Sequence, residues 1–174
     1  MIFTGFKRKS NQIFLNKRQS KLVNRTNIVS LKKIKKILVI CDDYSKKDII
    51  REELLKIFTL DEKDIAWVFF QQKLVKELES DDIISPKDFG WYGKVKSKNV
   101  TNILTKEYDL LINYSKIDSV YVNLLLLHSK VGFKAGFSHL NTDYYNLLIN
   151  CKTDELDIFT KELKKYLSIL NLIE

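Results

Sequence analysis

The sequence has few of the residues that interrupt regular structure: one proline and five glycines among 174 residues. Such a chain favours long helices and strands over the many tight turns of a β-sandwich. The only two cysteines, Cys41 and Cys151, lie in apolar runs typical of strands, which favours buried free thiols over a disulfide. No apolar run is long enough to span a bilayer, and no signal-peptide pattern is present. We therefore expect a cytoplasmic protein.

Acidic residues are absent from the first 36 positions, which contain 11 of the 30 Lys and Arg residues. The rest of the chain carries 19 basic and 22 acidic side chains, so the whole positive excess lies at the N-terminal end. Apolar residues among the bases are spaced partly as in an amphipathic helix. We predict a basic, partly helical N-terminal arm over residues 1–35 and one α/β domain over residues 36–174.

Uncompensated positive charge favours an anionic partner and a salt-dependent interaction. RNA or the ribosome is the preferred partner, and an anionic membrane surface is an alternative. A third interpretation is a solvated tail, or a helix that packs on the domain with its lysines outward. The candidate contact residues are Lys7, Arg8, Lys9, Lys17, Arg18, Lys21, Arg25, Lys32 and Lys33.

Continuous apolar runs alternate with amphipathic segments through the rest of the chain. This alternation predicts a single three-layer α/β domain with a mainly parallel, doubly wound (Rossmann-like) sheet of about five strands. Ser45 and Thr153 are the expected N-caps of the first and last helices of this domain. The expected strands cover residues 36–41, 64–71, 109–113, 133–137 and 145–151, and the expected helices cover 45–58, 117–130 and 153–170.

The segment from 71 to 98 is long for a connection and contains the only proline and two of the five glycines. Long ordered loops on such folds often have functional roles. Its aromatic rings could stack on a nucleotide base while its lysines neutralise phosphate, or the rings could plug the core with the lysines solvated. The residues concerned are Lys87, Phe89, Trp91, Tyr92 and Lys94.

In open parallel sheets, ligands bind beyond the carboxyl ends of the strands. Asp42 and Asp43 follow the first strand, and Asn113 and Ser115 follow the third, so these residues are candidates for a pocket. No glycine-rich dinucleotide turn, phosphate-binding P-loop or nucleophile elbow is present. The aspartate that a phosphoacceptor domain needs after its third strand is missing, and no histidine or cysteine has metal-site spacing.

We therefore expect no cofactor and no metal, and we lean against an enzyme. A non-enzymatic domain that binds an anionic partner through the arm is the first hypothesis. The alternatives are a small enzyme or a glycosyltransferase-like remnant that uses the strand-end pocket, and a peripheral membrane-surface protein.

Four sequence stretches, 85–94, 108–112, 133–136 and 164–167, resemble a small uncharacterised family of Bacteroidetes proteins over nearly the whole chain. That resemblance implies no known activity. Residues 108–137 are also similar to the acceptor-side, Rossmann-like half of heptosyltransferase-type glycosyltransferases. This second resemblance implies shared architecture rather than transferase activity, because the chain is too short to include the domain that binds the sugar nucleotide in that family.

Overall fold

The computed structural model describes residues 2–22, 33–73 and 80–173. Within them, six strands form one sheet in the order β3-β2-β1-β4-β5-β6, and every neighbouring pair is parallel. The strands are β1 (Ile37–Cys41), β2 (Ile65–Phe70), β3 (Ile83–Ile84), β4 (Glu107–Asn113), β5 (Lys130–Phe137) and β6 (Leu147–Ile149). The helices are α1 (Ile2–Leu22), α2 (Lys47–Leu55), α3 (Lys98–Thr105), α4 (Val120–His128) and α5 (Leu156–Ile169).

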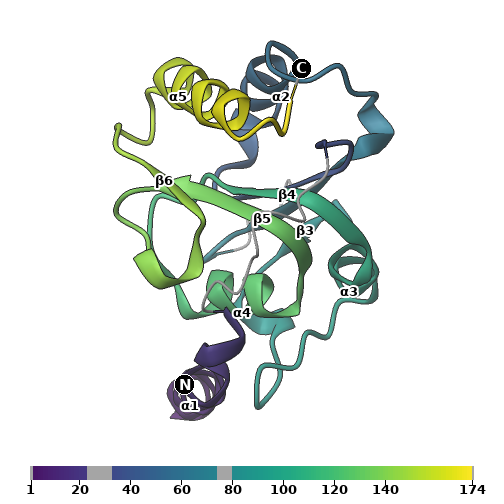
Figure 1. Ribbon diagram of the computed structural model, residues 1–174. Helices are drawn as coiled ribbons and strands as arrows, with labels where there is room; N and C mark the ends of the chain where they lie inside the picture. The colour runs from purple at the N-terminus through teal and green to yellow at the C-terminus, as the bar shows by residue number, and fades with distance from the viewer. Residues whose placement is uncertain (1, 23–32, 74–79, 174) are drawn as a thin grey trace.

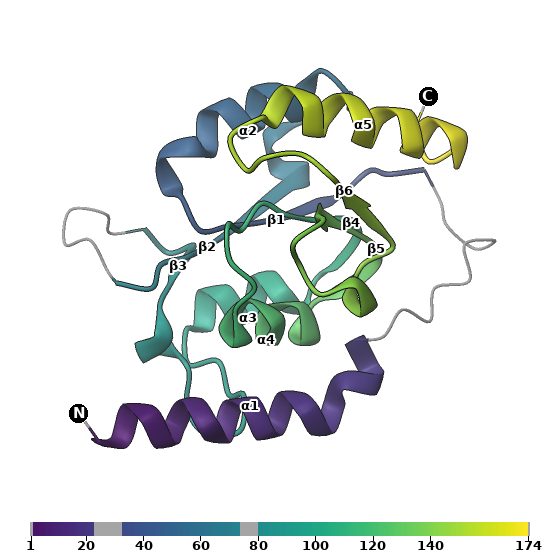
Figure 2. The same ribbon diagram turned by 90° about the vertical axis from the view of Figure 1, so that its left-hand side faces the viewer.

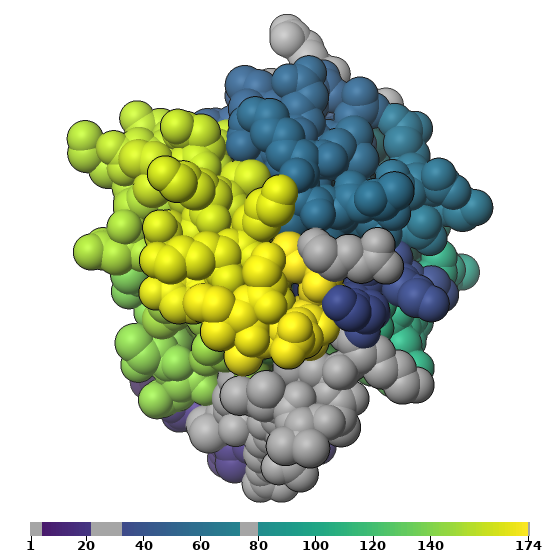
Figure 3. Space-filling view, turned by 45° about the horizontal axis from the view of Figure 1, so that its top comes forward, coloured from purple at the N-terminus to yellow at the C-terminus, as the bar shows by residue number. Residues whose placement is uncertain are grey.

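The central strands are apolar on both faces because helices cover both faces of the sheet. All five residues of β1 are buried, as are the last four of β4. Helices α2 and α5 lie on one face and α3 and α4 on the other (Figures 1 and 2). Figure 3 views the α2–α5 face, where α5 and the segment around α2 lie side by side. The predicted three-layer, doubly wound α/β fold is confirmed, with six parallel strands instead of about five.

Helix α1 adds to this arrangement from outside. It packs against α4 and lies beyond the α3–α4 layer (Figure 2). It accounts for the helical part of the predicted arm, whereas residues 23–32 lie outside the described residues. The boundary between arm and domain at residue 35 stays a prediction.

Several details of the expected elements were wrong. The N-cap of α2 is Lys46, without a side-chain bond, because Ser45 belongs to a short 3-10 turn that Asp43 caps. The N-cap of α5 is Glu155, not Thr153. The expected strand 145–151 is reduced to β6, and α4 ends at His128 because β5 already begins at Lys130.

The strand order places a topological switch point between β1 and β4. From β1 the chain runs outward through α2 to β2 and β3, and from β4 it runs outward in the opposite direction through α4 to β5. The loops that follow β1 and β4 therefore diverge, one toward each helical layer. A crevice at the carboxyl ends of these two strands follows from that divergence.

Candidate functional site

Helix α1 is held on the domain through one mainly buried side. Asn11 is fully buried and Leu15 nearly so, whereas most other described side chains of the helix are exposed. Two hydrogen bonds join α1 to the loop that follows η4 (Pro86–Asp88), and a third joins α4 to the same loop. The Tyr92 N–H donates to Ser10 Oγ (3.2 Å), the Gly93 N–H to Asn11 Oδ1 (2.8 Å), and His128 Nε2 to the Gly93 carbonyl (2.8 Å).

The aromatic loop divides its rings between the core and the surface. Phe89 is fully buried and its ring lies 5.0 Å from that of Tyr121, centre to centre. After it the chain turns sharply, with Tyr92 and Gly93 at positive φ (55° and 74°), so the next rings point outward. Trp91 is 47% exposed and Tyr92 68% exposed. The core-plug interpretation therefore holds for Phe89, but not for Trp91 and Tyr92.

The exposed rings of the loop meet exposed apolar side chains of α1. Phe6 is 60% exposed and Ile13 is 46% exposed, and both line a groove with Trp91 and Tyr92. The groove has a volume of about 340 Å³, and Lys9 and Ser10 complete its lining. We call these six residues the basic–aromatic surface: Phe6, Lys9, Ser10, Ile13, Trp91 and Tyr92. The structure thus joins two segments that are separate in the sequence and were each singled out there.

The described bases of α1 lie mainly at the surface of the helix. Within the described part of the chain, none of them forms an ion pair. Lys9, Lys17 and Lys21 are exposed, and the Arg18 guanidinium lies 3.9 Å from the centre of the Phe14 ring. Lys7 is half-buried beside the loop, where burial and then the charge of Lys96 lower its pKa, against a raising effect of Asp88.

The remaining predicted contact residues lie elsewhere. Arg25 and Lys32 fall outside the described residues. Lys33 donates through Nζ to the Ile173 carbonyl at 2.7 Å, so it is engaged with the C-terminal segment. Lys87 is exposed on η4 but does not line the groove.

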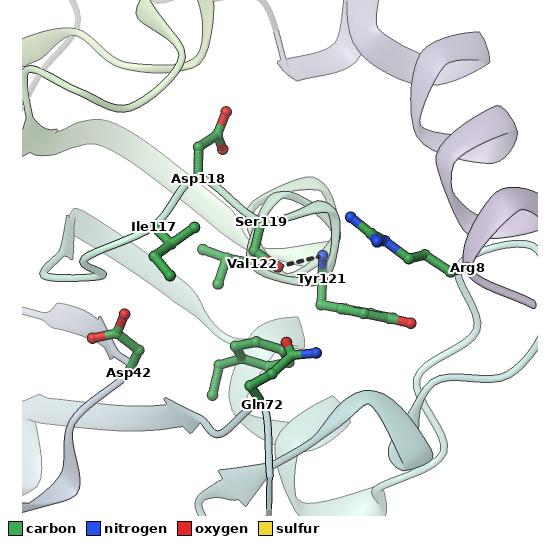
Figure 4. Close-up of a pocket in the computed structure, with 9 residues that line it drawn as sticks. Arg8, Asp42, Gln72, Ile117, Asp118, Ser119, Tyr121 and Val122 are labelled. Atoms are coloured by element: carbon green, nitrogen blue, oxygen red, sulfur yellow. Dashed lines mark hydrogen bonds between the residues drawn. The ribbon is translucent and has the colours of Figure 1, made fainter. Parts of the chain in front are cut away.

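A second cavity, the strand-end cleft, opens at the switch point (Figure 4). Its volume is about 360 Å³, within the usual range for small-molecule sites. Its polar lining comes from four separate parts of the chain: Arg8 of α1, Asp42 after β1, Gln72 after β2, and Asp118 and Ser119 before α4. Ser119 is the N-cap of α4, and its hydroxyl accepts the Tyr121 N–H at 3.4 Å.

The adjacent acids after β1 have opposite environments. Burial raises the pKa of Asp42, against the opposing hydrogen bond from the Lys116 N–H to its Oδ2 (2.7 Å). Hydrogen bonds from the Ser45 side chain and then from Lys116 lower the pKa of Asp43. Asp43 also forms a 2.9 Å ion pair with Lys116 Nζ. Asp43 is therefore a cap and an anchor for the neighbouring loop, and only Asp42 lines the cleft.

The two candidates at the carboxyl end of β4, Asn113 and Ser115, are buried. Asn113 is fully buried, donates through Nδ2 to the Tyr145 hydroxyl (2.7 Å), and accepts the Ser115 N–H at Oδ1 (3.0 Å). Ser115 is 1% exposed and does not line the cleft. The Asn113 side chain therefore fixes the start of the loop between β4 and α4, whereas Ser115 Oγ is buried without a hydrogen-bond partner among the described residues. The described residues contain no group of three or more His, Cys, Asp and Glu side chains placed to hold a metal ion.

Sequence reasoning missed the cleft residues that come from neither strand end. Arg8 was assigned to the basic arm, because its neighbours in the sequence do not indicate that α1 packs on the domain and brings Arg8 to the cleft that Asp42 also lines. Asp118 and Ser119 had a usable signal: a hydroxyl residue preceding the apolar run 120–127 is a typical N-cap. None of the described helices is both long and apolar enough to cross a membrane.

Comparison with known proteins places the chain in a family without assigning it an activity. Neither the curated proteins nor the solved structures contain a significant match to the chain. The resemblance to heptosyltransferase-type proteins therefore stays a prediction. A family match covers nearly the whole length of the sequence. On that match, over residues 7–170, the chain belongs to the family of unknown function DUF6913.

Proposed function

We propose that this protein binds single-stranded RNA through the basic–aromatic surface. The observation that supports the proposal is the convergence of exposed Phe6, Trp91 and Tyr92 beside a helix whose bases form no ion pair among the described residues. Proteins that bind single strands combine aromatic rings, on which bases stack, with positive charge that follows the backbone. Both components lie here on one face.

The groove suits a flat ligand with a charged backbone. Trp91 and Tyr92 offer exposed rings for stacking, and Lys9 stands at the groove edge, where it can reach a phosphate. Lys17 and Lys21 extend the positive charge along the same helix beyond the groove. If an RNA strand stacks its bases in the groove, the lysines farther along α1 are therefore placed to contact its next phosphates.

A membrane surface is the competing partner, and the composition of α1 disfavours it. Interfacial helices separate a broad apolar face from a charged face. In α1 the amphipathic separation is weak and the helix is polar on average. Among the side chains of α1 that the structure describes, the exposed apolar ones are Phe6 and Ile13, and both line a concave groove with the loop.

The test is fluorescence anisotropy of a labelled short oligouridylate, titrated with the full chain over a salt series. Trp91→Ala should weaken binding by about 1–3 kcal/mol, the usual contribution of one stacked base. Lys9→Gln should weaken binding and reduce the slope of log affinity against log salt by about 0.7, the value for one phosphate contact with a single strand. Far-UV circular dichroism and thermal unfolding check that each variant is folded.

Matched controls lie on the opposite helical layer. Tyr166 of α5 is an exposed ring and Lys165 an exposed lysine, so Tyr166→Ala and Lys165→Gln repeat the same changes away from the groove. Both controls should bind RNA as the unmodified chain does. If the controls weaken binding as much as the groove variants, or if the chain binds anionic vesicles and not RNA, the proposal is wrong.

A further inference from the structure

The strand-end cleft is not part of the basic–aromatic surface, and it has charges of both signs. Six of its lining residues, Arg8, Asp42, Gln72, Asp118, Ser119 and Tyr121, carry polar side-chain groups. It lies at the switch point between β1 and β4, where open α/β sheets bind their ligands. Its volume is large enough for a small metabolite.

One end of the cleft is suited to an anion. The Arg8 guanidinium points from α1 toward the first turn of α4, which begins at Val120 (Figure 4). Arg8 forms no ion pair within the described residues. Its charge acts on Tyr121, where it opposes the rise in pKa that burial causes. A guanidinium and the start of a helix together match the charge and hydrogen-bond geometry of a phosphate group.

The other end of the cleft offers an acceptor. Asp42 lies across the cleft from Arg8 (Figure 4). Its Oδ2 accepts the Lys116 N–H, but its Oδ1 is buried and has no partner among the described residues. A buried carboxylate oxygen without a donor is costly. A small rotation of the Asp42 carboxylate toward the cleft would bring this oxygen to a hydroxyl group of a ligand. Asp118 also lines the cleft, and its Oδ1 accepts the Asn123 side-chain N–H at 2.8 Å.

The middle of the cleft is apolar. Ile117 is 70% exposed, and its side chain lies with Val122 between the acidic and basic ends (Figure 4). Apolar side chains at this place can pack against the carbon skeleton of a ligand whose two ends are polar. The lining therefore matches an elongated ligand that is anionic at one end, carries hydroxyl groups at the other end and has a carbon skeleton between them.

We propose that the strand-end cleft binds a small phosphate monoester with free hydroxyl groups, the phosphate at Arg8 and the hydroxyls toward Asp42. Sugar phosphates and nucleoside monophosphates share this chemistry. The site is independent of RNA binding, because Arg8 and Asp42 do not line the groove with Trp91 and Tyr92. Either proposal can fail without affecting the other.

Isothermal titration of the full chain with ribose 5-phosphate, adenosine monophosphate, ribose and inorganic phosphate tests this assignment. We expect binding of at least one monoester, with ribose and inorganic phosphate each at least about tenfold weaker, since each lacks one end of the ligand. Tighter binding of ribose 5-phosphate indicates a sugar phosphate site, and tighter binding of adenosine monophosphate a nucleotide site.

Two variants and one control locate the ligand. Arg8→Gln should reduce monoester affinity about tenfold or more, as expected for the loss of a charge-assisted contact to phosphate. Asp42→Asn should weaken the monoester and leave the weak binding of inorganic phosphate unchanged. Lys17→Gln removes the same charge from the same helix away from the cleft, and it should leave the affinity for the monoester unchanged.

Three results would overturn the assignment. The first is that neither monoester binds the folded chain. The second is that Lys17→Gln weakens binding as much as Arg8→Gln, because the attraction would then come from the net charge of the helix. The third is that inorganic phosphate binds as tightly as the monoesters, which would leave Asp42 without a role. Thermal unfolding of each variant confirms that it is folded before titration.

Discussion

The side-chain oxygen of Asn11 accepts the backbone N–H of Gly93 at 2.8 Å, at a point where Asn11 has no exposed surface. This bond joins residues 82 positions apart and ties α1 to the aromatic loop. Because Ser10 also accepts the Tyr92 N–H, the same stretch of α1 sets the position of the exposed rings. The basic–aromatic surface therefore depends on a small polar contact beneath it.

Replacing Asn11 should separate these segments. Asn11→Ala leaves the buried Gly93 N–H without an acceptor, which should lower the free energy of unfolding by about 1–3 kcal/mol. Asn16→Ala is the matched control, because Asn16 is exposed on the same helix and alanine favours helix. Urea unfolding of both variants measures the difference. An equal decrease in the free energy of unfolding of the two variants would show that the hydrogen bond of Asn11 makes no specific contribution to stability.

Gly93 should tolerate no side chain. A Cβ there would lie 2.5 Å from Cε1 of Phe14, and the residue has a φ of +74°. Gly93→Ala therefore combines a backbone cost of about 1–2 kcal/mol with a collision that pushes against α1. We expect a lower melting temperature, faster proteolysis within α1 and weaker RNA binding.

Gly5→Ala supplies the comparison for this variant. Gly5 also lies in α1, but a Cβ there would have nothing within 4 Å. Alanine should stabilise the helix at this position, since glycine is a poor helix former. If Gly93→Ala has the same melting temperature and the same protease resistance as Gly5→Ala, the close packing of Phe14 on the loop is contradicted.

The sheet could be predicted from the sequence because its central strands carry their own signal. β1 and β2 are runs of apolar, mainly β-branched and aromatic residues, a pattern that needs no knowledge of the partner strand. β3 has only two residues, Ile83 and Ile84, too few for any periodicity to appear. Its strand character comes from pairing with β2, and such pairing is invisible in a single segment.

The two candidate sites could be predicted only in pieces. The bases of α1 and the exposed rings of the loop were both identified, but their meeting depends on Asn11 and Gly93, whose contact spans half the chain. Arg8 belongs to the cleft only because α1 packs on α4. The sequence of α1 has no strong apolar stripe from which this packing could be predicted. Long-range polar contacts determine these positions, and sequence periodicity does not report them.

The two cysteines should differ in reactivity. Both are free thiols, but Cys41 is buried, and burial raises its pKa to about 12, whereas Cys151 is half-buried. Since the thiolate is the reactive form, Ellman's reagent at mildly alkaline pH should modify Cys151 slowly and leave Cys41 intact until the protein unfolds. A Cys151→Ser variant isolates Cys41, and rapid modification of its folded form would show that β1 opens to solvent.

Asp42 and Asp43 should make opposite contributions to the pH dependence of stability. The ordinary pKa of both is 3.8, and the fold lowers that of Asp43 through Ser45 and Lys116. The charged form of Asp43 is therefore favoured by folding: its contribution is present above pH 3.8 and disappears as the pH falls through the lowered value. Asp43→Asn, which keeps an oxygen for the Ser45 bonds, should destabilise the protein at neutral pH but not in acid.

For Asp42 the sign reverses, because burial raises its pKa above 3.8. The folded state binds the proton more tightly, so charging Asp42 costs stability as the pH rises through its raised value, and the cost persists at neutral pH. Asp42→Asn removes that cost while retaining an acceptor for the Lys116 N–H. Its stability relative to the unmodified chain should therefore be higher at neutral pH than below pH 3.8.

Urea unfolding of Asp42→Asn and Asp43→Asn at both pH values, beside the unmodified chain, gives the comparison. Parallel curves for Asp42→Asn and the unmodified chain would mean that the Asp42 carboxylate is as well solvated in the folded protein as in the unfolded chain.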